Sequence, residues 1–132
     1  MIEKSSEWKQ WILYSEEDLQ SAETLLSSEN TFPRNVCYLS QQSVEKALKA
    51  IFVFLNMSFA KIHDLEALYA KLPSDIKDKL NLEGLSELSE WAVEARYPGD
   101  TMPPTENDAN FSISVARRNI YSIKLLLEEG NL

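Results

Sequence analysis

The sequence predicts an all-α fold, an up-and-down bundle of about five helices. Three long segments repeat their apolar residues with the period of an α-helix, about 3.6 residues. No stretch alternates apolar and polar residues as a half-buried strand does. The three glycines and five prolines cluster between the periodic segments. With 132 residues, of which 44% are hydrophobic, the chain suits a single domain over residues 1–132.

The first helix is expected from about Ser6 to Ser28. Apolar and small side chains share one face of it, namely Trp8, Trp11 or Ile12, Ser15, Leu19, Ala22 and Leu26. Glu16, Glu17, Gln20 and Glu23 point away from that face, as solvated residues should. Trp8 and Trp11 are therefore interpreted as core or interface residues rather than as a platform for stacking bases.

The second helix is expected from Pro33 to about Asn56, because proline fits the first turn of a helix. It begins like a surface helix, with a polar stripe of Gln42, Glu45, Lys46 and Lys49. Continued by one turn, this stripe meets Phe52 and Val53, so the outer face of the far half is apolar. Either the short helices of the chain or a second subunit must cover these two residues. We expect a twofold homodimer and place its candidate interface there.

Shorter elements follow, and a long helix ends the chain. Asp64 is expected as the N-cap or as a first-turn acid of a short helix that Pro73 ends. One or two further short helices are expected within residues 75–95. The stretch RYPGDTMPPT holds three prolines and a glycine, which indicates a loop. Thr105 opens the last helix, and Asp108 stands where a capping box needs its acidic partner.

Composition limits the classes of function. The net charge of −8 argues against broad nucleic-acid binding, because contacts with phosphates need clustered Lys and Arg. The one cysteine, Cys37, excludes a disulfide within the chain, which is typical of a reducing compartment, and we expect it to fill the core. The start of the chain lacks the apolar run of a signal peptide, and AIFVFL is too short to span a bilayer. We expect a cytoplasmic protein without a membrane partner.

Five short motifs, DLQSAETLL, SQQSVEKALKAIF, HDLEAL, ARYPGD and TENDANFSISVARR, resemble in order and spacing those of the HEPN domain family. These small helical proteins of prokaryotes are often encoded beside a minimal nucleotidyltransferase. The resemblance covers nearly the whole chain and implies a five-helix bundle that commonly forms homodimers. It also implies a range of roles, from ribonuclease toxins and their inactive relatives to nucleotide-binding or accessory subunits.

The ribonuclease branch of that family carries an arginine, four to six intervening residues and then a histidine. His63 is the only histidine, and residues 56–58, where the arginine would stand, are Asn, Met and Ser. Counted forward from Arg96, residues 101–103 hold no histidine. The motif is absent, so we expect no catalytic residues. His63 is expected to form local hydrogen bonds or to pack at the start of its short helix.

The candidate ligand-binding site combines three cations with an aromatic ring, namely Lys46, Lys49, Arg96 and Tyr97. A guanidinium is a flat fork for phosphate or carboxylate, and a tyrosine ring can stack on a base. The candidate supporting residues are Asp18, Glu45, His63 and Asp64. In the alternative interpretation, Arg96 pairs with an acid such as Asp18, Glu45 or Glu94 and only holds the loop. One histidine among surface acids lacks the spacing of a metal site, and no glycine-rich phosphate loop exists, so neither a metal nor a cofactor is expected.

These observations favour a non-catalytic binding or regulatory protein that acts with a nucleotidyltransferase partner. Its role would be toxin–antitoxin-like, or that of a nucleotide-binding accessory subunit. Two alternatives stay open. One is a divergent ribonuclease that uses Arg96, His63 or Tyr97 in an unusual arrangement. The other is a dimeric helical scaffold without a ligand.

Overall fold

The computed structural model describes residues 4–59, 61–94 and 102–129, and within these ranges the chain is helical and contains no strand. The helices are α1 (Lys4–Ser27), α2 (Pro33–Phe54), α3 (Leu65–Ala70), α4 (Ser74–Lys79), α5 (Leu85–Glu94) and α6 (Glu106–Glu128). The prediction of an all-α bundle is confirmed. The described residues form six helices rather than about five, because two short helices, α3 and α4, flank Pro73. In the same ranges, no helix has the length and apolar character needed to cross a bilayer.

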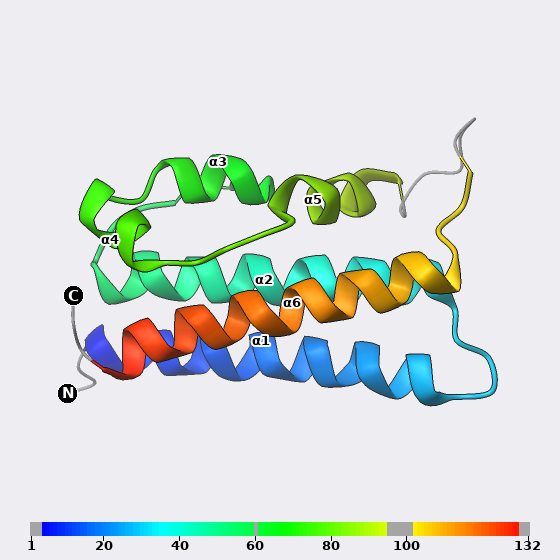
Figure 1. Ribbon diagram of the computed structural model, residues 1–132. Helices are drawn as coiled ribbons and strands as arrows, with labels where there is room; N and C mark the ends of the chain where they lie inside the picture. The colour runs from blue at the N-terminus through cyan, green and yellow to red at the C-terminus, as the bar shows by residue number, and fades with distance from the viewer. Residues whose placement is uncertain (1–3, 60, 95–101, 130–132) are drawn as a thin grey trace.

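The long helices α1, α2 and α6 lie side by side, and the segment that carries α3, α4 and α5 covers α2 from the other side (Figure 1). Helix α2 runs opposite to α1, whereas α6 runs in the same direction as α2 (Figure 1). Helix α2 contacts α1, α6, α5 and α3 and is therefore the central helix of the bundle. Its central position explains why 13 of its 22 residues are buried and why several of these are polar or charged.

The buried face of α1 is the one that the sequence predicts. Trp8, Ile12, Ser15, Leu19 and Ala22 are all buried. The small Ser15 side chain donates a hydrogen bond to the backbone oxygen of Ser43 on α2, so the hydroxyl that it buries is satisfied. The contact between α1 and α2 thus combines apolar packing with a buried polar bridge from Ser15.

Phe52 is fully buried by the chain itself. Its ring packs edge to face on Phe59, with 6.0 Å between the centroids, and Phe59 meets Trp11 at 5.6 Å. Val53 is half-buried. The segment after α2 folds back over this face, so Phe52 has no surface left for a partner. The placement of a dimer interface at Phe52 is therefore wrong, and the homodimer stays a prediction without that argument.

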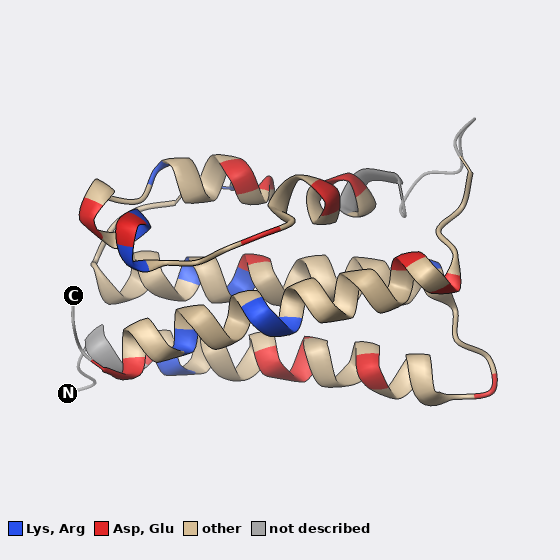
Figure 2. Cartoon of the chain, viewed as in Figure 1, with Lys and Arg blue, Asp and Glu red and all other residues tan. Residues whose placement is uncertain are grey.

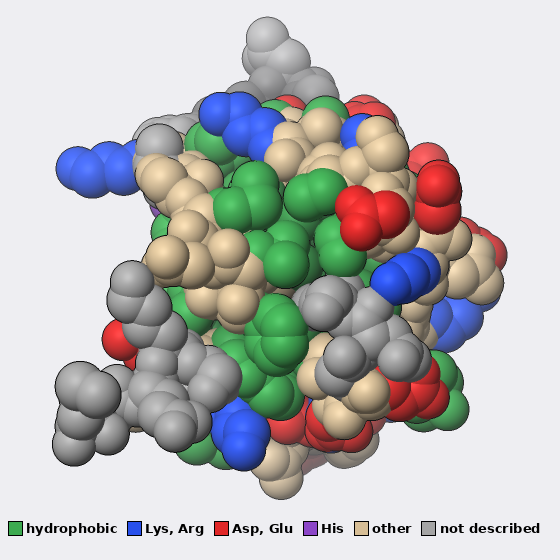
Figure 3. Space-filling view, turned by 90° about the vertical axis from the view of Figure 1, so that its left-hand side faces the viewer, with side chains coloured by type: hydrophobic (Ala, Val, Ile, Leu, Met, Phe, Trp, Pro, Cys, Tyr) green, Lys and Arg blue, Asp and Glu red, His purple; other side chains and the backbone are tan. Residues whose placement is uncertain are grey.

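Apolar surface remains instead at one end of the bundle. Figure 3 shows hydrophobic side chains gathered at the end where α2 and α6 finish and α1 begins. Phe54 and Leu55, the last residue of α2 and the residue after it, are half-buried, and Trp8 packs on Phe54 with 5.8 Å between ring centroids. The apolar far half of α2 is thus covered along its side and left partly open at its tip.

Two helix starts have the caps expected from the sequence. The Asp64 carboxylate accepts hydrogen bonds from the backbone N–H groups of Glu66 and Ala67, at 2.9 and 3.1 Å. Thr105 and Asp108 form a full capping box, in which each side chain accepts from the backbone N–H of the other. Both caps satisfy backbone donors that a helix start leaves unpaired and so fix where α3 and α6 begin.

The chain that leads into α5 lies tightly against α6. The buried Asn119 side chain holds the Glu83 backbone at both ends, since its Oδ1 accepts from Glu83 N at 3.0 Å and its Nδ2 donates to Glu83 O at 2.8 Å. The next residue, Gly84, has a φ of +68°, which favours glycine. A Cβ atom at this position would lie 2.8 Å from Val115 Cγ1. Both the backbone conformation and the space therefore require glycine here.

We predict that Gly84→Ala lowers the free energy of unfolding by roughly 2–5 kcal/mol, from the left-handed backbone and the overpacking together. Urea denaturation followed by far-UV circular dichroism measures the change. Adding Val115→Ala should remove the overpacking part, so the two substitutions together should cost less than their sum. The exposed Ser86→Ala is the control on α5, and a Gly84→Ala protein as stable as this control would contradict the prediction.

Candidate functional site

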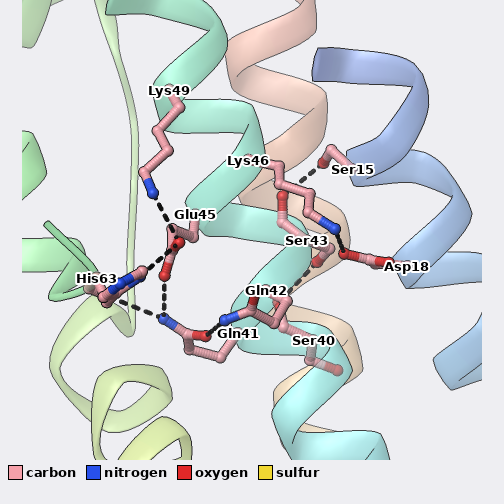
Figure 4. Close-up of polar contacts among 10 residues, drawn as sticks. All are labelled: Ser15, Asp18, Ser40, Gln41, Gln42, Ser43, Glu45, Lys46, Lys49 and His63. Carbon is pink, nitrogen blue, oxygen red and sulfur yellow. Dashed lines mark hydrogen bonds and ion pairs between the residues drawn. The ribbon is translucent and has the colours of Figure 1, made fainter. Parts of the chain in front are cut away.

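The polar stripe of α2, expected on the surface, is largely buried. Gln41, Glu45 and Lys49 are all buried, whereas Lys46 and Gln42 are half-buried. The segment between α2 and α3, which carries His63, lies against this side of α2 (Figure 4). Charges removed from water cost free energy unless they are paired and hydrogen-bonded. The contacts within this group therefore decide what chemistry the site can support.

Glu45 is the centre of a buried network (Figure 4). Its Oε2 accepts a hydrogen bond from Lys49 Nζ at 2.9 Å and lies 3.1 Å from His63 Nδ1. Its Oε1 accepts from Gln41 Nε2 at 3.2 Å, and the same amide nitrogen lies 3.1 Å from the backbone oxygen of His63. One carboxylate thus joins a cation, an amide and an imidazole, and it ties α2 to the segment that covers it.

Lys46 and Lys49, expected to share an anion site, face different partners (Figure 4). Lys46 Nζ lies 2.6 Å from Asp18 Oδ2 on α1, so the Asp18 carboxylate is engaged by Lys46. Lys49 Nζ pairs with Glu45 and lies 5.3 Å from the centroid of the Phe59 ring. The two ammonium groups therefore do not converge on one ligand. The spacing places both lysines on one side of α2, but Lys49 is buried in its pair with Glu45.

The other predicted site residues divide into two groups. Arg96 and Tyr97 lie outside the described residues, so the ligand site expected around them stays a prediction. Asp64 lies within them, and its carboxylate is occupied as the N-cap of α3. Asp64 is therefore assigned a structural role, and its neighbour His63 is the residue of this pair that reaches the network.

His63 is the exposed member of the network. Its side chain is 63% exposed, whereas that of Glu45 is 5% exposed. A carboxylate that holds one ring nitrogen fixes the orientation of an imidazole and can assist proton transfer at its other nitrogen. Cleavage of a phosphodiester also benefits from a cation at the phosphate. The cation of this network, Lys49, is buried against Glu45 and so cannot supply that contact.

Cys37 has the properties of a core residue, as expected. It is fully buried, and burial raises the pKa of its thiol to about 11, with a smaller lowering from the Ser112 hydroxyl and a further increase from the charge of Asp108. A thiol with so high a pKa is a poor nucleophile. No group of three or more His, Cys, Asp and Glu side chains is placed to hold a metal ion in the parts of the chain that the structure describes.

A groove of about 680 Å³ beside α6 was not anticipated from the sequence. Its lining comes from the end of α4, from the chain before α5 and from α6, namely Lys79, Asn81, Glu83, Ser114, Arg117, Arg118, Tyr121, Ser122 and Leu125. The spacing of large apolar residues in the sequence could have predicted it, because the exposed Phe111, Tyr121 and Leu125 form a second stripe of α6, opposite the buried one.

We predict that Glu45→Ala lowers the free energy of unfolding by roughly 3–5 kcal/mol, because it leaves Lys49 buried without its partner. The matched control is Asp18→Ala, which breaks the more accessible pair with Lys46 and should cost about 1 kcal/mol or less. Urea denaturation compares the two, since urea does not screen charges. Replacing both buried partners, with Glu45→Leu and Lys49→Met, should recover much of the loss. Equal losses in the two single variants would contradict this account of the network.

The bundle and its motifs match known proteins. Residues 8–126 match the HEPN domain family. "Putative toxin MJ1304" of Methanocaldococcus jannaschii is 34% identical, over 92% of this chain and 88% of that protein. The crystal structure of ST0689, an archaeal HEPN homologue, aligns with a TM-score of 0.71 and 28% identity, over 91% of this chain and 97% of that one. The family match and the relatives run across the bundle from α1 to α6, and they confirm the resemblance found in the sequence: the chain belongs to the HEPN domain family.

Proposed function

We propose that this protein is the HEPN component of a toxin–antitoxin-like pair, that it acts with a nucleotidyltransferase partner, and that it works by binding rather than by cutting RNA. The observation that carries this proposal is the closed Glu45–Lys49 pair, whose lysine side chain is 8% exposed. Residues 56–58, where the ribonuclease pattern would place its arginine before His63, are Asn, Met and Ser. The only histidine therefore has no arginine at the catalytic spacing and no accessible lysine in its network.

The chemical argument rests on what phosphodiester cleavage requires. An imidazole can move a proton near neutral pH, but the charge that develops on the phosphate also needs stabilisation. Lys49 neutralises Glu45 inside the bundle instead. The network consequently supports the fold and holds His63 in place, while the functional contacts of the protein are made elsewhere on its surface.

The partner arrangement draws support from the relatives. The M. jannaschii relative is named "Putative toxin MJ1304", which supports a toxin–antitoxin-like role for this chain. In such a role the chain would act with a second protein. We further propose a homodimer, which the half-buried Phe54 and Leu55 at the end of the bundle support better than Phe52 does. Nucleotide binding at Arg96 and Tyr97, and a cytoplasmic location suited to an unpaired cysteine, complete the proposal.

A divergent ribonuclease is the second candidate, and one observation favours it. His63 Nδ1 lies 3.1 Å from a buried carboxylate while most of the ring is exposed. A carboxylate that orients an imidazole is a recurring part of acid–base catalysis. For this candidate to hold, the phosphate would have to meet a cation from another part of the molecule.

We predict that the purified protein leaves both a structured and a single-stranded RNA intact. General acid–base groups raise the rate of such reactions about 10²–10⁴-fold. A protein without them should therefore give no cleavage products on a gel. His63→Ala is the informative variant, because an exposed side chain can be removed without unfolding the bundle. Cleavage by the wild type that disappears in His63→Ala would reject the binding role and establish the ribonuclease.

We predict that a reading frame beside the gene encodes a minimal nucleotidyltransferase and that the two proteins elute together in size-exclusion chromatography after co-expression. The chain purified alone is the control and should elute as a homodimer. Separate elution of the two proteins, or a neighbouring frame of another kind, would contradict the partnership. A monomeric control would contradict the homodimer alone.

A further inference from the structure

Helix α6 carries a second, uncovered stripe along the face that turns away from the core. Phe111, Ser114, Arg118, Tyr121 and Leu125 are all exposed, and they follow one another at alternating steps of three and four residues. Such spacing is that of a seam between two packed helices. Tyr121, with 67% of its surface exposed, is the largest apolar contribution to this stripe. The face has the pattern of a helix contact, but none of the helices that the structure describes packs on it.

Hydrogen bonds fix the backbone that lines the groove beside this stripe. Asn119 holds the Glu83 backbone through two hydrogen bonds, and Ser122 Oγ accepts from the backbone N–H of Asn81 at 3.2 Å. From Ser114 to Leu125 the groove follows α6 for about 16 Å, or three helical turns. A site this long and this well held suits an elongated occupant better than a compact one such as a mononucleotide.

The charge of the groove indicates the chemistry of its occupant. Its lining contains three basic residues, Lys79, Arg117 and Arg118, and one acidic residue, Glu83. The whole chain, in contrast, has a net charge of −8. Basic residues lie midway along α6 (Figure 2). Arg118 lies 3.3 Å from Glu83, and both side chains are more than half exposed. Arg117 pairs with Glu23 of α1, and these two side chains are 59% and 38% exposed. Exposed pairs of this kind are weak, so acids of a partner can replace Glu83 and Glu23.

A second copy of this chain would fit the groove poorly. A twofold contact places the same patch on both subunits, and here it would bring the cluster of Arg117 and Arg118 against itself. Like charges that face each other oppose association. An occupant with acidic residues beside an apolar stripe would instead meet both the arginines and the ring of Tyr121.

We propose that this groove docks an acidic amphipathic helix of a partner protein, with its apolar side on Tyr121 and Leu125 and its carboxylates on Arg117, Arg118 and Lys79. The inference deepens the proposed function and rests on it in one respect, the assumption of a protein partner. It does not require that the partner be a nucleotidyltransferase. It adds the surface and the chemistry of recognition, neither of which involves the His63 network.

Site-specific photocrosslinking in the native host tests the proposal. The variant Tyr121→p-benzoylphenylalanine places the crosslinker in the groove, and Tyr14→p-benzoylphenylalanine, at an exposed tyrosine of α1, is the matched control. Mass spectrometry identifies the crosslinked peptide. We expect position 121, but not position 14, to capture a segment of another protein that has an excess of Asp and Glu and apolar residues at helical spacing.

Charge reversal provides the second arm. In the Tyr121 crosslinker background, Arg117→Glu with Arg118→Glu should lower the crosslink yield by roughly tenfold or more. The exposed Lys71→Glu on the α3 side should leave it unchanged, and thermal melts verify that both variants are folded. The proposal would be overturned if position 121 captured a second copy, RNA or a basic segment. It would also be overturned if the crosslink yield were no higher than at position 14 or did not respond to charge reversal. A partner that still elutes with the charge-reversed chain would leave the proposed function standing without this surface.

Discussion

The ion pair between Glu45 and Lys49 constrains the rest of the structure because it lies on the one helix that the others surround. Helix α2 contacts four of its neighbours, so a polar residue that it buries must find a partner inside the bundle. Glu45 meets this requirement through Lys49, Gln41 and His63. His63 and its backbone oxygen bind this network and so hold the segment after α2 over the pair. Phe59 then reaches both Phe52 and Trp11, and the apolar side of α2 is covered.

The same interaction decides where function can be located. A cation engaged by a buried carboxylate is a poor ligand for an external phosphate, since releasing it would leave an unpaired charge in the core. Lys46 is likewise held, by Asp18 at 2.6 Å. The basic residues with exposed side chains on α6, Arg117 and Arg118, are bound only by weak surface pairs. We therefore place the proposed recognition of an acidic partner on α6 and assign the polar face of α2 to the stability of the fold.

Patterns among neighbouring residues predict the helices and their caps well, whereas contacts between distant segments could not be predicted from the sequence. Helical period placed Trp8 and Ile12 in the core, and Asp64 and Thr105 were identified as caps, because each depends on residues within a few positions. Periodicity groups residues on a face but does not say what covers that face. The burial of Lys49 and Phe52 depends on a segment that folds back after the helix has ended. Likewise, the groove beside α6 depends on Asn119 binding the Glu83 backbone 36 positions away.

The layer formed by α3, α4 and α5 is attached at two places, and this links the two sides of the molecule. On one side the Glu45 network holds His63, and Leu65 N donates to Ser89 Oγ at 3.0 Å, which joins the start of α3 to α5. On the other side Asn119 fixes the chain that leads into α5. A partner in the α6 groove would touch this chain and α6 together, so it binds only when the layer is in place. By mass action such a ligand stabilises the closed bundle and, with it, the cover over the buried ion pair. The network around His63 and the groove that we propose for a partner would then reinforce one another.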